Sequence, residues 1–512
     1  MSAEVPFNGI LFEHPSDRGG REDPQMFRDL NLDQIFAAVA VGRAEYDLMP
    51  FFSAPLRDVR AVEYRHQVQR DMEDKALSGA LEEFALRMRE MRKSLAQSGK
   101  LRTRYQKEYW FLDAASIYRQ AVSTLADALT AIEPGSRGFT AFGQYLADHT
   151  RSAAFTSLAG DIEKVTTALA TVRYCVNIKG NRVTVSGYED QVDYSAEVQR
   201  TFAKFAVGAV KDYRVGFRNW AEMNHVEAHI LDLVARLYPG VFSALDEFRA
   251  RHAAYLDDTI RVFDREVQFY TAYRDFITPI RMAGLDFCYP VVSAASKAIS
   301  ARDSFDLALA AKLMPKAAAV VRNDFYLNGP ERIFVVTGPN NGGKTTFARM
   351  FGQHHYLASL GYPVPAREAA LFLPDRVFTH FEKEEDLATL RGKFEDELVR
   401  IRGVLDQATG DSVLIMNESF GSTTLRDALF VGERVLDRMT ARGLLGVYVT
   451  FVDELASLSE ACVSMVGAMV PDNPAERTYK IVRKPADGLA YAAAIAGKYG
   501  LTCWQLKERL AS

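Results

Sequence analysis

The sequence predicts two parts, a largely helical region followed by an α/β domain built on a mostly parallel sheet. Proline is scarce between Pro55 and Pro279, where only Pro134 and Pro239 occur although the chain has 18 prolines. Because helix interiors exclude proline, this depletion indicates helices. Apolar residues in the same segment recur at three- and four-residue steps. From about Met282, short apolar runs alternate with helical patterns, which is typical of α/β domains.

Length and composition limit the class of protein. The chain has 512 residues, with 62 Lys and Arg against 66 Asp and Glu, so its formal net charge is −4. This length predicts two or three domains. The charge excludes an overall basic coat, so nucleic-acid contacts would need local patches. The four cysteines lie far apart, and no apolar run reaches the ~18 residues that span a bilayer. We therefore expect a cytoplasmic protein with no membrane contact.

The helical region has a predicted beginning and one predicted interruption. Residues 1–29 are polar and rich in turn formers, which predicts a mobile N-terminal tail. Residues 30–281 are predicted to form helices whose apolar stripes make a bundle core. Two β-branched runs near 172–188 flank Lys179-Gly180-Asn181, which predicts a β-hairpin with Gly180 or Asn181 at positive φ. Residues 282–512 are predicted to form the α/β domain.

A phosphate loop is the strongest signal in the chain. An apolar run at 333–337 precedes Gly338–Thr345, which has the G-x-x-x-x-G-K-T spacing, and a helical pattern follows. In such a loop backbone N–H groups surround phosphates, the lysine reaches the β- and γ-phosphates, and the hydroxyl binds Mg²⁺. The sequence therefore predicts ATP and Mg²⁺ as ligands. The predicted nucleotide-binding residues are Gly338, Pro339, Asn340, Asn341, Gly342, Gly343, Lys344, Thr345 and Thr346.

A second strand should supply acidic residues beside the phosphate loop. The apolar run 412–416 ends in Asn417 and Glu418. We expect Glu418 to act as general base or to orient the attacking water, and we expect Lys344 to assist catalysis. Asn417 stands where an Asp commonly supports Mg²⁺. Its amide oxygen can still accept a hydrogen bond from a metal-bound water, but it carries no charge. The alternative for Glu418 is a solvated acid at a strand end.

These motifs resemble those of the MutS family of DNA mismatch-repair ATPases. The Pro-Asn-x-Gly-Gly interior of residues 337–346 distinguishes that family from other phosphate loops. Further segments that resemble the family are 323–324, 362–366, 375–379, 386–387, 422–427 and 488–497. The resemblance covers residues 282–512 and, more loosely, the helices before them. It does not extend to an N-terminal mismatch-recognition module, since only about 29 residues precede the helical region.

The resemblance implies a fold class, a helical lever or clamp region followed by an α/β ABC-type P-loop ATPase domain. It also implies a homodimer with composite ATP sites coupled to DNA. Asp427 matches the end of the family's D-loop. Lys393 replaces a hydroxyl of the signature segment and could meet a γ-phosphate of the partner's site, while Phe451 replaces a histidine that senses the γ-phosphate. The family places an aromatic residue ahead of the phosphate-loop strand, which suggests that Phe325 contacts adenine. The alternative for Phe325 is a core position.

Two functions remain open from the sequence. The first is a dimeric ATPase that couples ATP binding and slow hydrolysis to DNA binding in mismatch repair or a related repair or recombination process. The alternative is a nucleotide-gated scaffold for a protein partner, with little hydrolysis. Branched, mismatched or non-specific duplex DNA could contact Lys179 and Arg182 at the hairpin, although basic residues there could also form only a solvated face. Further candidates for phosphate contact are Lys204, Lys211, Arg214 and Arg218.

Overall fold

The computed structural model describes residues 7–17, 24–180, 182–189, 223–314, 319–382, 392–470 and 473–486, with the single residues 197, 200, 201 and 507. The chain divides into two compact units. Unit 1 comprises residues 1–6, 71–135 and 139–264, and unit 2 comprises residues 7–70, 136–138 and 265–512. The predicted order of a helical region followed by an α/β region is confirmed. Within the described residues no helix is long and apolar enough to cross a bilayer.

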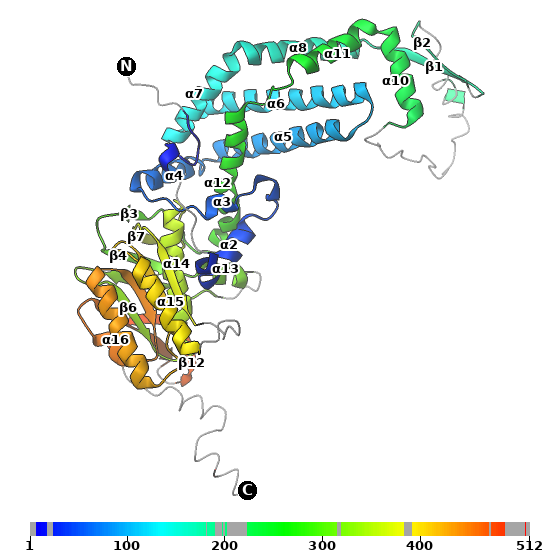
Figure 1. Ribbon diagram of the computed structural model, residues 1–512. Coiled ribbons are helices and arrows are strands. Elements are labelled where there is room, and N and C mark those ends of the chain that lie inside the picture. Colours follow the sequence, from blue (N-terminus) through cyan, green and yellow to red (C-terminus); the bar gives the residue numbers. More distant parts are fainter. Residues whose placement is uncertain are drawn as a thin grey trace, which may run out of the picture. The chain divides into compact units, whose positions relative to one another are not determined.

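Unit 1 consists of long helices and one hairpin (Figure 1). Its elements are α5 (Lys75–Lys100), α6 (Arg104–Ile132), most of α7 (Arg137–Arg151), α8 (Ala153–Ala170), β1 (Tyr174–Lys179), β2 (Arg182–Gly187), α10 (His225–Leu237), α11 (Pro239–Arg251) and the first part of α12 (Asp258–Met282). Helices α5 and α6 lie side by side, since only three residues join them. Phe142 stacks on Phe263 with ring centroids 3.6 Å apart. The antiparallel hairpin lies at the predicted residues, and Gly180 has a φ of 60°.

The described residues of unit 2 form two sheets. The six-stranded sheet has the order β12-β11-β6-β10-β9-β8, and the four-stranded sheet has the order β3-β7-β4-β5. Its strands are β3 (Val291–Ser293), β4 (Ile299–Ser304), β5 (Asn323–Leu327), β6 (Ile333–Thr337), β7 (Glu368–Phe372), β8 (Val377–Phe381), β9 (Val413–Asn417), β10 (Leu445–Val449), β11 (Cys462–Val470) and β12 (Asn473–Arg483). Its helices are η1 (Pro15–Asp17), α1 (Pro24–Asp29), α2 (Leu32–Val39), η2 (Ala44–Tyr46), α3 (Met49–Phe52), α4 (Val59–Asp71), α13 (Leu307–Leu313), α14 (Lys344–Ser359), α15 (Lys393–Gln407), α16 (Leu425–Arg442) and η4 (Asp453–Ser457). The last residue of α4 is assigned to unit 1, and α12 from Arg265 onward is assigned to unit 2.

Helices cover both faces of the six-stranded sheet. Strands β6, β9 and β10 are buried along their whole length, which is why their sequences are continuously apolar. On one face the rings of Phe347 and Phe351 from α14 pack edge-on against Phe334 of β6. On the other face α15, α16 and η4 pack against alternate residues of the same strands. Figure 1 shows α15 and α16 side by side in front of the sheet.

The N-terminal residues that the structure describes are packed, so the predicted mobile tail over residues 1–29 is wrong for this part. Ile10 and Leu11 are buried, and both of their backbone N–H groups donate to Oε2 of Glu266, at 2.9 and 3.3 Å. Arg65 donates from Nε to the carbonyl of Leu11 at 3.0 Å, and Tyr270 donates to that of Ile10 at 2.8 Å. The sequence pattern could not show this because the binding partners lie far along the chain. Residues 1–6 and 18–23 lie outside the described residues.

The predicted boundary at residue 281 also differs from the observed units. Helices α1–α4 belong to unit 2, although they precede the helices of unit 1 in the sequence. Gln353 of α14 donates to the carbonyl of Leu30 at 3.0 Å, and Arg349 donates to that of Asp29 at 2.9 Å. A Cβ added to Gly352 would lie 2.7 Å from Cδ2 of Leu30, so the turn between α1 and α2 sits directly on α14. The α/β unit therefore includes its own helical N-terminal cover.

Candidate nucleotide site at the carboxyl end of the sheet

The predicted phosphate loop, Asn417 and Glu418 lie at the carboxyl end of central strands of the six-stranded sheet. Val336 of β6 pairs with Val449 of β10, and Val449 pairs with Asn417 of β9, so the parallel strands end at the same level. The phosphate loop leaves β6 at this level and leads into α14. Ligands of open α/β sheets bind at this end of the strands.

Two glycines give the loop its shape. Gly338 has a φ of 117°, and an added Cβ would lie 2.9 Å from the backbone nitrogen of Gly467 on β11. Gly343 has a φ of 94° and forms the N-cap of α14. Positive φ at the helix entrance turns backbone N–H groups toward one point, where the helix dipole favours an anion. The predicted strand, loop and helix thus have the geometry that phosphate binding requires.

Lys344 lies at the mouth of this loop and is buried. Its Nζ donates to the carbonyls of Gly338 and Pro339, at 2.9 and 3.2 Å, and to Oδ1 of Asn340 at 3.3 Å. Burial lowers the pKa of Lys344, while the carboxylate of Glu418 acts in the opposite direction. All three present partners are neutral oxygens of its own loop. A phosphate oxygen would be a stronger, charged acceptor for the same ammonium group.

Asn417 is the last residue of β9, and Glu418 follows it. Glu418 is half-buried, has a φ of 52°, and donates its backbone N–H to the carbonyl of Val449 at 2.9 Å. Asn417 is buried, and its Oδ1 has no hydrogen-bond partner within the described part of the chain. Such an orphaned acceptor at the level of the phosphate loop suits a water molecule bound to a metal ion. Thr345 lies in the first turn of α14 and is half-buried.

The residues fit a magnesium ion that is held mainly by nucleotide phosphates. Within the described residues no group of three or more His, Cys, Asp or Glu side chains could hold a metal by itself. Mg²⁺ often uses only one or two protein ligands together with phosphates and waters. Thr345 and Asn417 provide a hydroxyl and an amide oxygen of the required kind.

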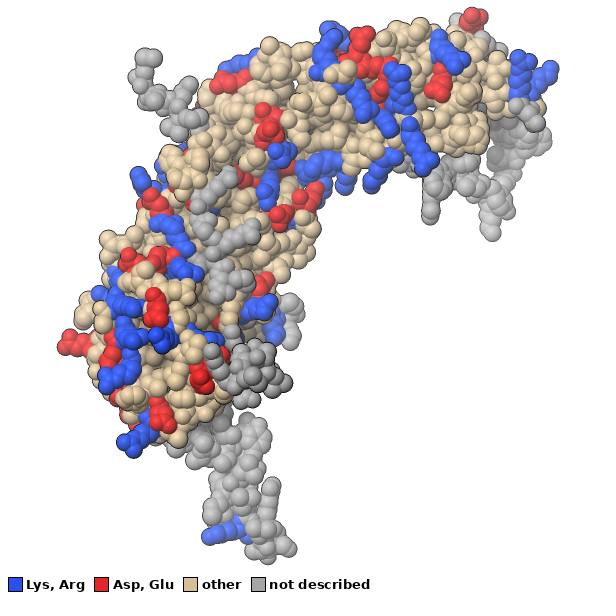
Figure 2. All heavy atoms as spheres, in the orientation of Figure 1, with Lys and Arg blue, Asp and Glu red and all other residues tan. Residues whose placement is uncertain are grey.

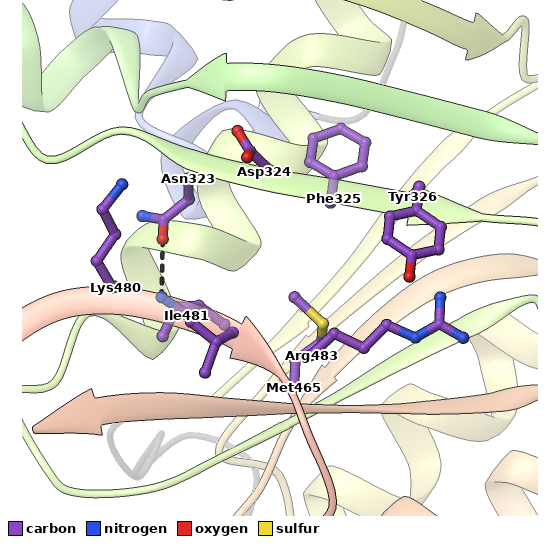
Figure 3. A pocket seen from close by; sticks show the side chains of 9 residues that line it. Asn323, Asp324, Phe325, Tyr326, Met465, Lys480, Ile481 and Arg483 are labelled. Carbon is purple, nitrogen blue, oxygen red and sulfur yellow. Dashed lines mark hydrogen bonds between the residues drawn. The ribbon is translucent and has the colours of Figure 1, made fainter.

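Phe325 does not fit the predicted role at the adenine. It is 2% exposed, and its ring packs edge-on against Phe334, Phe347 and Phe351 with centroid distances of 6.0, 6.3 and 5.5 Å. The residue borders a cavity of about 400 Å³ between β5 and β12, shown in Figure 3. There its ring lies on the opposite side of β5 from the ring of Tyr326. Side chains alternate along a strand, and the core face of β5 takes Phe325.

Tyr479 is an aromatic residue beside the phosphate loop that the sequence analysis missed. It is 51% exposed and has a φ of 57°. Its carbonyl oxygen would lie 3.4 Å from a Cβ added to Gly343. Asn323 fixes this part of β12, because its side chain donates to the carbonyl of Tyr479 at 3.3 Å and accepts from the backbone N–H of Ile481 at 2.7 Å. A Tyr in the second half of an alternating strand gave no signal in the sequence.

Two further charged residues act on Lys344. Arg477 of β12 lowers the pKa of Lys344, and the carboxylate of Asp453 at the start of η4 raises it. Asp453 comes three residues after Thr450, whose backbone N–H donates to the carbonyl of Val336 at 3.1 Å. The segment after β10 therefore supplies a carboxylate. Strand β10 lies next to β9, where Asn417 occupies the position at which an Asp was expected.

The residues expected at a composite site lie apart from Lys344 in the sequence and have local partners. Asp427 accepts hydrogen bonds from the hydroxyls of Thr424 at 2.8 Å and Thr423 at 3.4 Å, at the start of α16. Lys393, at the start of α15, forms an ion pair with Glu382. Phe451 is 50% exposed. The 386–387 and 488–497 segments of the family resemblance lie outside the described residues.

Candidate contacts to a phosphate backbone lie in unit 1. Lys179 and Arg182 are exposed and face each other across the hairpin. Helix α5 adds exposed Lys93 and Lys100 on one side of the helix. Figure 2 shows Lys and Arg side chains gathered over the α5 side of this unit. The helix set predicted from the sequence, Lys204, Lys211, Arg214 and Arg218, lies outside the described residues.

Comparisons with known proteins match the part of the chain that carries this site. Residues 334–501 match the family model for MutS domain V. Endonuclease MutS2 of Thermus thermophilus is 31% identical over 191 residues, which cover 37% of this chain and 25% of that protein. DNA mismatch repair protein MutS of Thermotoga maritima is 29% identical over 170 residues, covering 33% and 21%. MutS of Azorhizobium caulinodans is 35% identical over 156 residues, covering 29% and 17%.

The chain spans a quarter or less of the length of these curated relatives. The match begins within β6 and takes in the phosphate loop, α14 and Glu418. The resemblance drawn from the sequence motifs is thereby confirmed for this region. Residues 334–501 of this chain are thus similar to domain V of the MutS family.

Proposed function

We propose that this protein binds ATP with Mg²⁺ at the carboxyl end of the six-stranded sheet, hydrolyses it slowly as a homodimer, and couples this cycle to DNA binding in mismatch repair or a related repair process. The observation that carries the proposal is the arrangement of Lys344 and Glu418. The lysine closes a glycine-shaped loop at a helix N-terminus. The carboxylate follows β9, which β10 separates from β6, and the three strands end at the same level. The match of residues 334–501 to MutS domain V provides further support.

Each residue has a defined task in this proposal. The loop N–H groups bind phosphate oxygens, and Lys344 exchanges its present carbonyl partners for the β- and γ-phosphates. Glu418 orients the attacking water and accepts its proton. Thr345 and Asn417 hold Mg²⁺, which when bound neutralises charge on the phosphates. We assign the contact with the adenine ring to Tyr479 in place of Phe325, since the Tyr479 side chain is exposed beside the loop.

Hydrolysis should be slow because three groups differ from what fast hydrolysis requires. Asn417 brings no charge to the metal, and Phe451 cannot donate a hydrogen bond to the γ-phosphate. Lys393 is held by Glu382 and replaces a hydroxyl. Loss of one transition-state donor costs about 2.7–4 kcal/mol, or about 10²–10³ in kcat. We expect turnover well below the ~10 s⁻¹ that is typical of enzymes.

A dimer is supported by exposed apolar side chains near the nucleotide site. Leu425 and Phe451 are 58% and 50% exposed, and a Cβ added to Gly421 would lie 4.0 Å from the Phe451 ring. Large exposed apolar side chains that gather in one place mark an interaction surface. The start of α15 with Lys393 would then face the nucleotide of the other subunit, as in the family's composite sites.

DNA is the partner that the relatives and the basic hairpin support. The alternative remains a nucleotide-gated scaffold that binds a protein, which is favoured by the exposed apolar side chains of the same hairpin, Tyr174, Val176 and Ile178. These lie on one face of β1. The two proposals differ in salt dependence, because phosphate contacts release counterions and weaken steeply as salt is added.

One set of measurements tests the proposal. Calorimetry should show that Lys344→Ala weakens ATP binding at least tenfold, or about 1.4 kcal/mol. Lys312→Ala, which changes an exposed lysine of α13, is the matched control and should bind normally. Steady-state hydrolysis should be slow, absent in Glu418→Gln, and stimulated by linear or branched duplex DNA in a salt-dependent way. Normal ATP binding by Lys344→Ala would refute the nucleotide site. Hydrolysis that no DNA changes would favour the protein scaffold.

A further inference from the structure

The turn that follows β9 is strained at two positions. Glu418 has a φ of 52° and Phe420 has a φ of 66°. Residues with a Cβ rarely adopt these angles, and a bulky ring makes them rarer still. Such a backbone persists only where its surroundings hold it. Ser419 and Phe420 are buried, so the support must come from neighbouring side chains.

Glu397 of α15 supplies one of these supports. Its Oε2 accepts the backbone N–H of Phe420 at 3.0 Å, and the residue is 1% exposed. Its Oε1 has no partner within the described part of the chain. Burial raises the pKa of Glu397, while the hydrogen bond from Phe420 acts in the opposite direction. The Glu397 carboxyl group is thus buried, which is energetically unfavourable for a carboxylate. There it accepts a hydrogen bond from the backbone of Phe420, two residues after Glu418.

His380 of β8 is a second support on the same turn. Its Nδ1 lies 2.9 Å from Oγ of Ser419, and its Nε2 lies 3.2 Å from the carbonyl oxygen of Glu397. The Ser419 hydroxyl also reaches the carbonyl of His380 at 3.2 Å. The imidazole therefore joins the turn to α15 through both nitrogens.

The first turn of α15 contacts the same residues. The ring of Phe394 packs edge-on against that of Phe420, with centroids 6.4 Å apart. Arg400, one turn after Glu397, donates to the carbonyl of Phe381 at 3.3 Å. Phe381 pairs with Asn417. Helix α15 is thus attached to the ends of β8 and β9 on both sides of the strained turn.

We propose that Glu397 is a positioning residue, which holds the Glu418–Phe420 turn so that the Glu418 carboxylate faces the phosphate loop, and which links that carboxylate to the first turn of α15. This inference rests on the proposed function, because it concerns the group that orients the attacking water. A displacement of α15 at Lys393 would be transmitted through Phe394 and Glu397 to Glu418. The hydrolytic carboxylate would then respond to whatever contacts the start of α15.

Two substitutions at one position separate the roles. Glu397→Leu fills the space but removes the acceptor, whereas Glu397→Gln keeps an oxygen for the Phe420 N–H. We expect Glu397→Leu to lower kcat on the order of 10²-fold, as misplaced catalytic groups do, with ATP affinity unchanged. Glu397→Gln should restore most of the rate. Ile401→Ala removes volume from the same buried side of α15 and should lower the melting temperature without lowering kcat.

Hydrogen exchange gives a readout that does not depend on hydrolysis. In the full-length protein, amide exchange in a peptide covering residues 414–425 should become at least tenfold faster in Glu397→Leu and stay nearly normal in Glu397→Gln. Unchanged exchange, or an active protein in which Glu397→Leu hydrolyses ATP normally, would overturn the inference. If the unaltered protein does not hydrolyse ATP while the exchange results are as expected, the hold of Glu397 on the turn is supported and the proposed hydrolysis fails.

Discussion

In unit 1 neighbouring helices contact each other mainly through apolar side chains, many of them aromatic. In unit 2, by contrast, buried polar side chains form hydrogen bonds to the backbone of segments far away in the sequence. Phe142 on Phe263, and Phe111 on Phe248, represent the first kind of contact. Arg65, whose two hydrogen bonds reach the carbonyls of Leu11 and Leu360, represents the second. Both units hold ionisable groups in their interiors, but the histidines whose pKa burial lowers to about 4, His66, His354 and His355, lie in unit 2.

This difference follows from what each unit has to position. The helices of unit 1 are continuous, so most of their backbone groups are satisfied within each helix. Unit 2 brings loop and strand ends together around the phosphate loop, and those ends leave carbonyls and N–H groups that need side-chain partners. The candidate nucleotide site therefore lies in the unit that is more sensitive to single polar substitutions and to pH.

The largest expected effect is a loss of stability of unit 2 in mild acid. Burial lowers the pKa of His66, His354 and His355 to about 4, from 6.5 for an ordinary histidine. Between pH 6.5 and 4 these histidines bind protons in the unfolded chain but stay neutral in the folded unit. The free energy of unfolding therefore falls as the pH falls. Each histidine contributes about 1.4 kcal/mol per pH unit. Asp306 and Glu397, whose pKa values burial raises, oppose this trend.

We expect unit 2 to lose roughly 2–6 kcal/mol of unfolding free energy between pH 6.5 and pH 5, and unit 1 to lose less. Urea unfolding followed by hydrogen-exchange mass spectrometry measures each unit separately. His66→Phe keeps the apolar volume beside Tyr289 and cannot titrate, so it should reduce the pH dependence of unit 2. An equal loss in both units would remove the contrast between them.

A comparable effect should follow from removing a buried cation. Arg65→Met retains much of the side-chain volume but leaves two carbonyls without their donor, and we expect unit 2 to lose about 3–5 kcal/mol of unfolding free energy. The matched change in unit 1 is Arg104→Ala. Its side chain is 64% exposed in ion pairs with Asp246 and Glu108, so we expect a much smaller loss. Similar losses for the two variants in urea unfolding would contradict the comparison.

The smallest expected effect concerns a helix cap in unit 1. Asn224 accepts the backbone N–H groups of Val226 and Glu227, both at 2.9 Å, and Glu227 accepts the N–H of Asn224 in return. Asn224→Ala should destabilise unit 1 by about 1 kcal/mol, while Asn224→Asp should stay within a few tenths. Circular dichroism during urea unfolding would measure both. A larger loss would mean that unit 1 also depends on single polar groups.

The features that were predictable from the sequence are those set by residues close together in the chain. The strand, glycine loop and helix around Lys344 follow from the consecutive residues 333–350, and Glu418 follows directly from the apolar run before it. The hairpin with Gly180 follows from local turn chemistry. Each of these depends on backbone preferences and side-chain patterns that act over a few residues.

The features that escaped prediction depend on residues far apart. Phe325 lies on the buried face of β5, and which face of a strand is buried depends on the helix packed against it. Tyr479 reaches Gly343 only through the pairing of β12 with β11, and Glu397 reaches Phe420 across the packed face of α15. The packing of Ile10 against Glu266 spans 256 residues. No local pattern encodes such contacts.

The attachment of residues 9–11 to Glu266 has a consequence for the order of events during synthesis. This segment leaves the ribosome well before its carboxylate partner, which is made 256 residues later. At about 5–20 residues per second, the segment waits roughly 10–50 s before it can bind. Until then Ile10 and Leu11 are available to chaperones. Residues 9–11 therefore complete the fold of unit 2 late, and removing them would leave Glu266 buried without its two backbone donors.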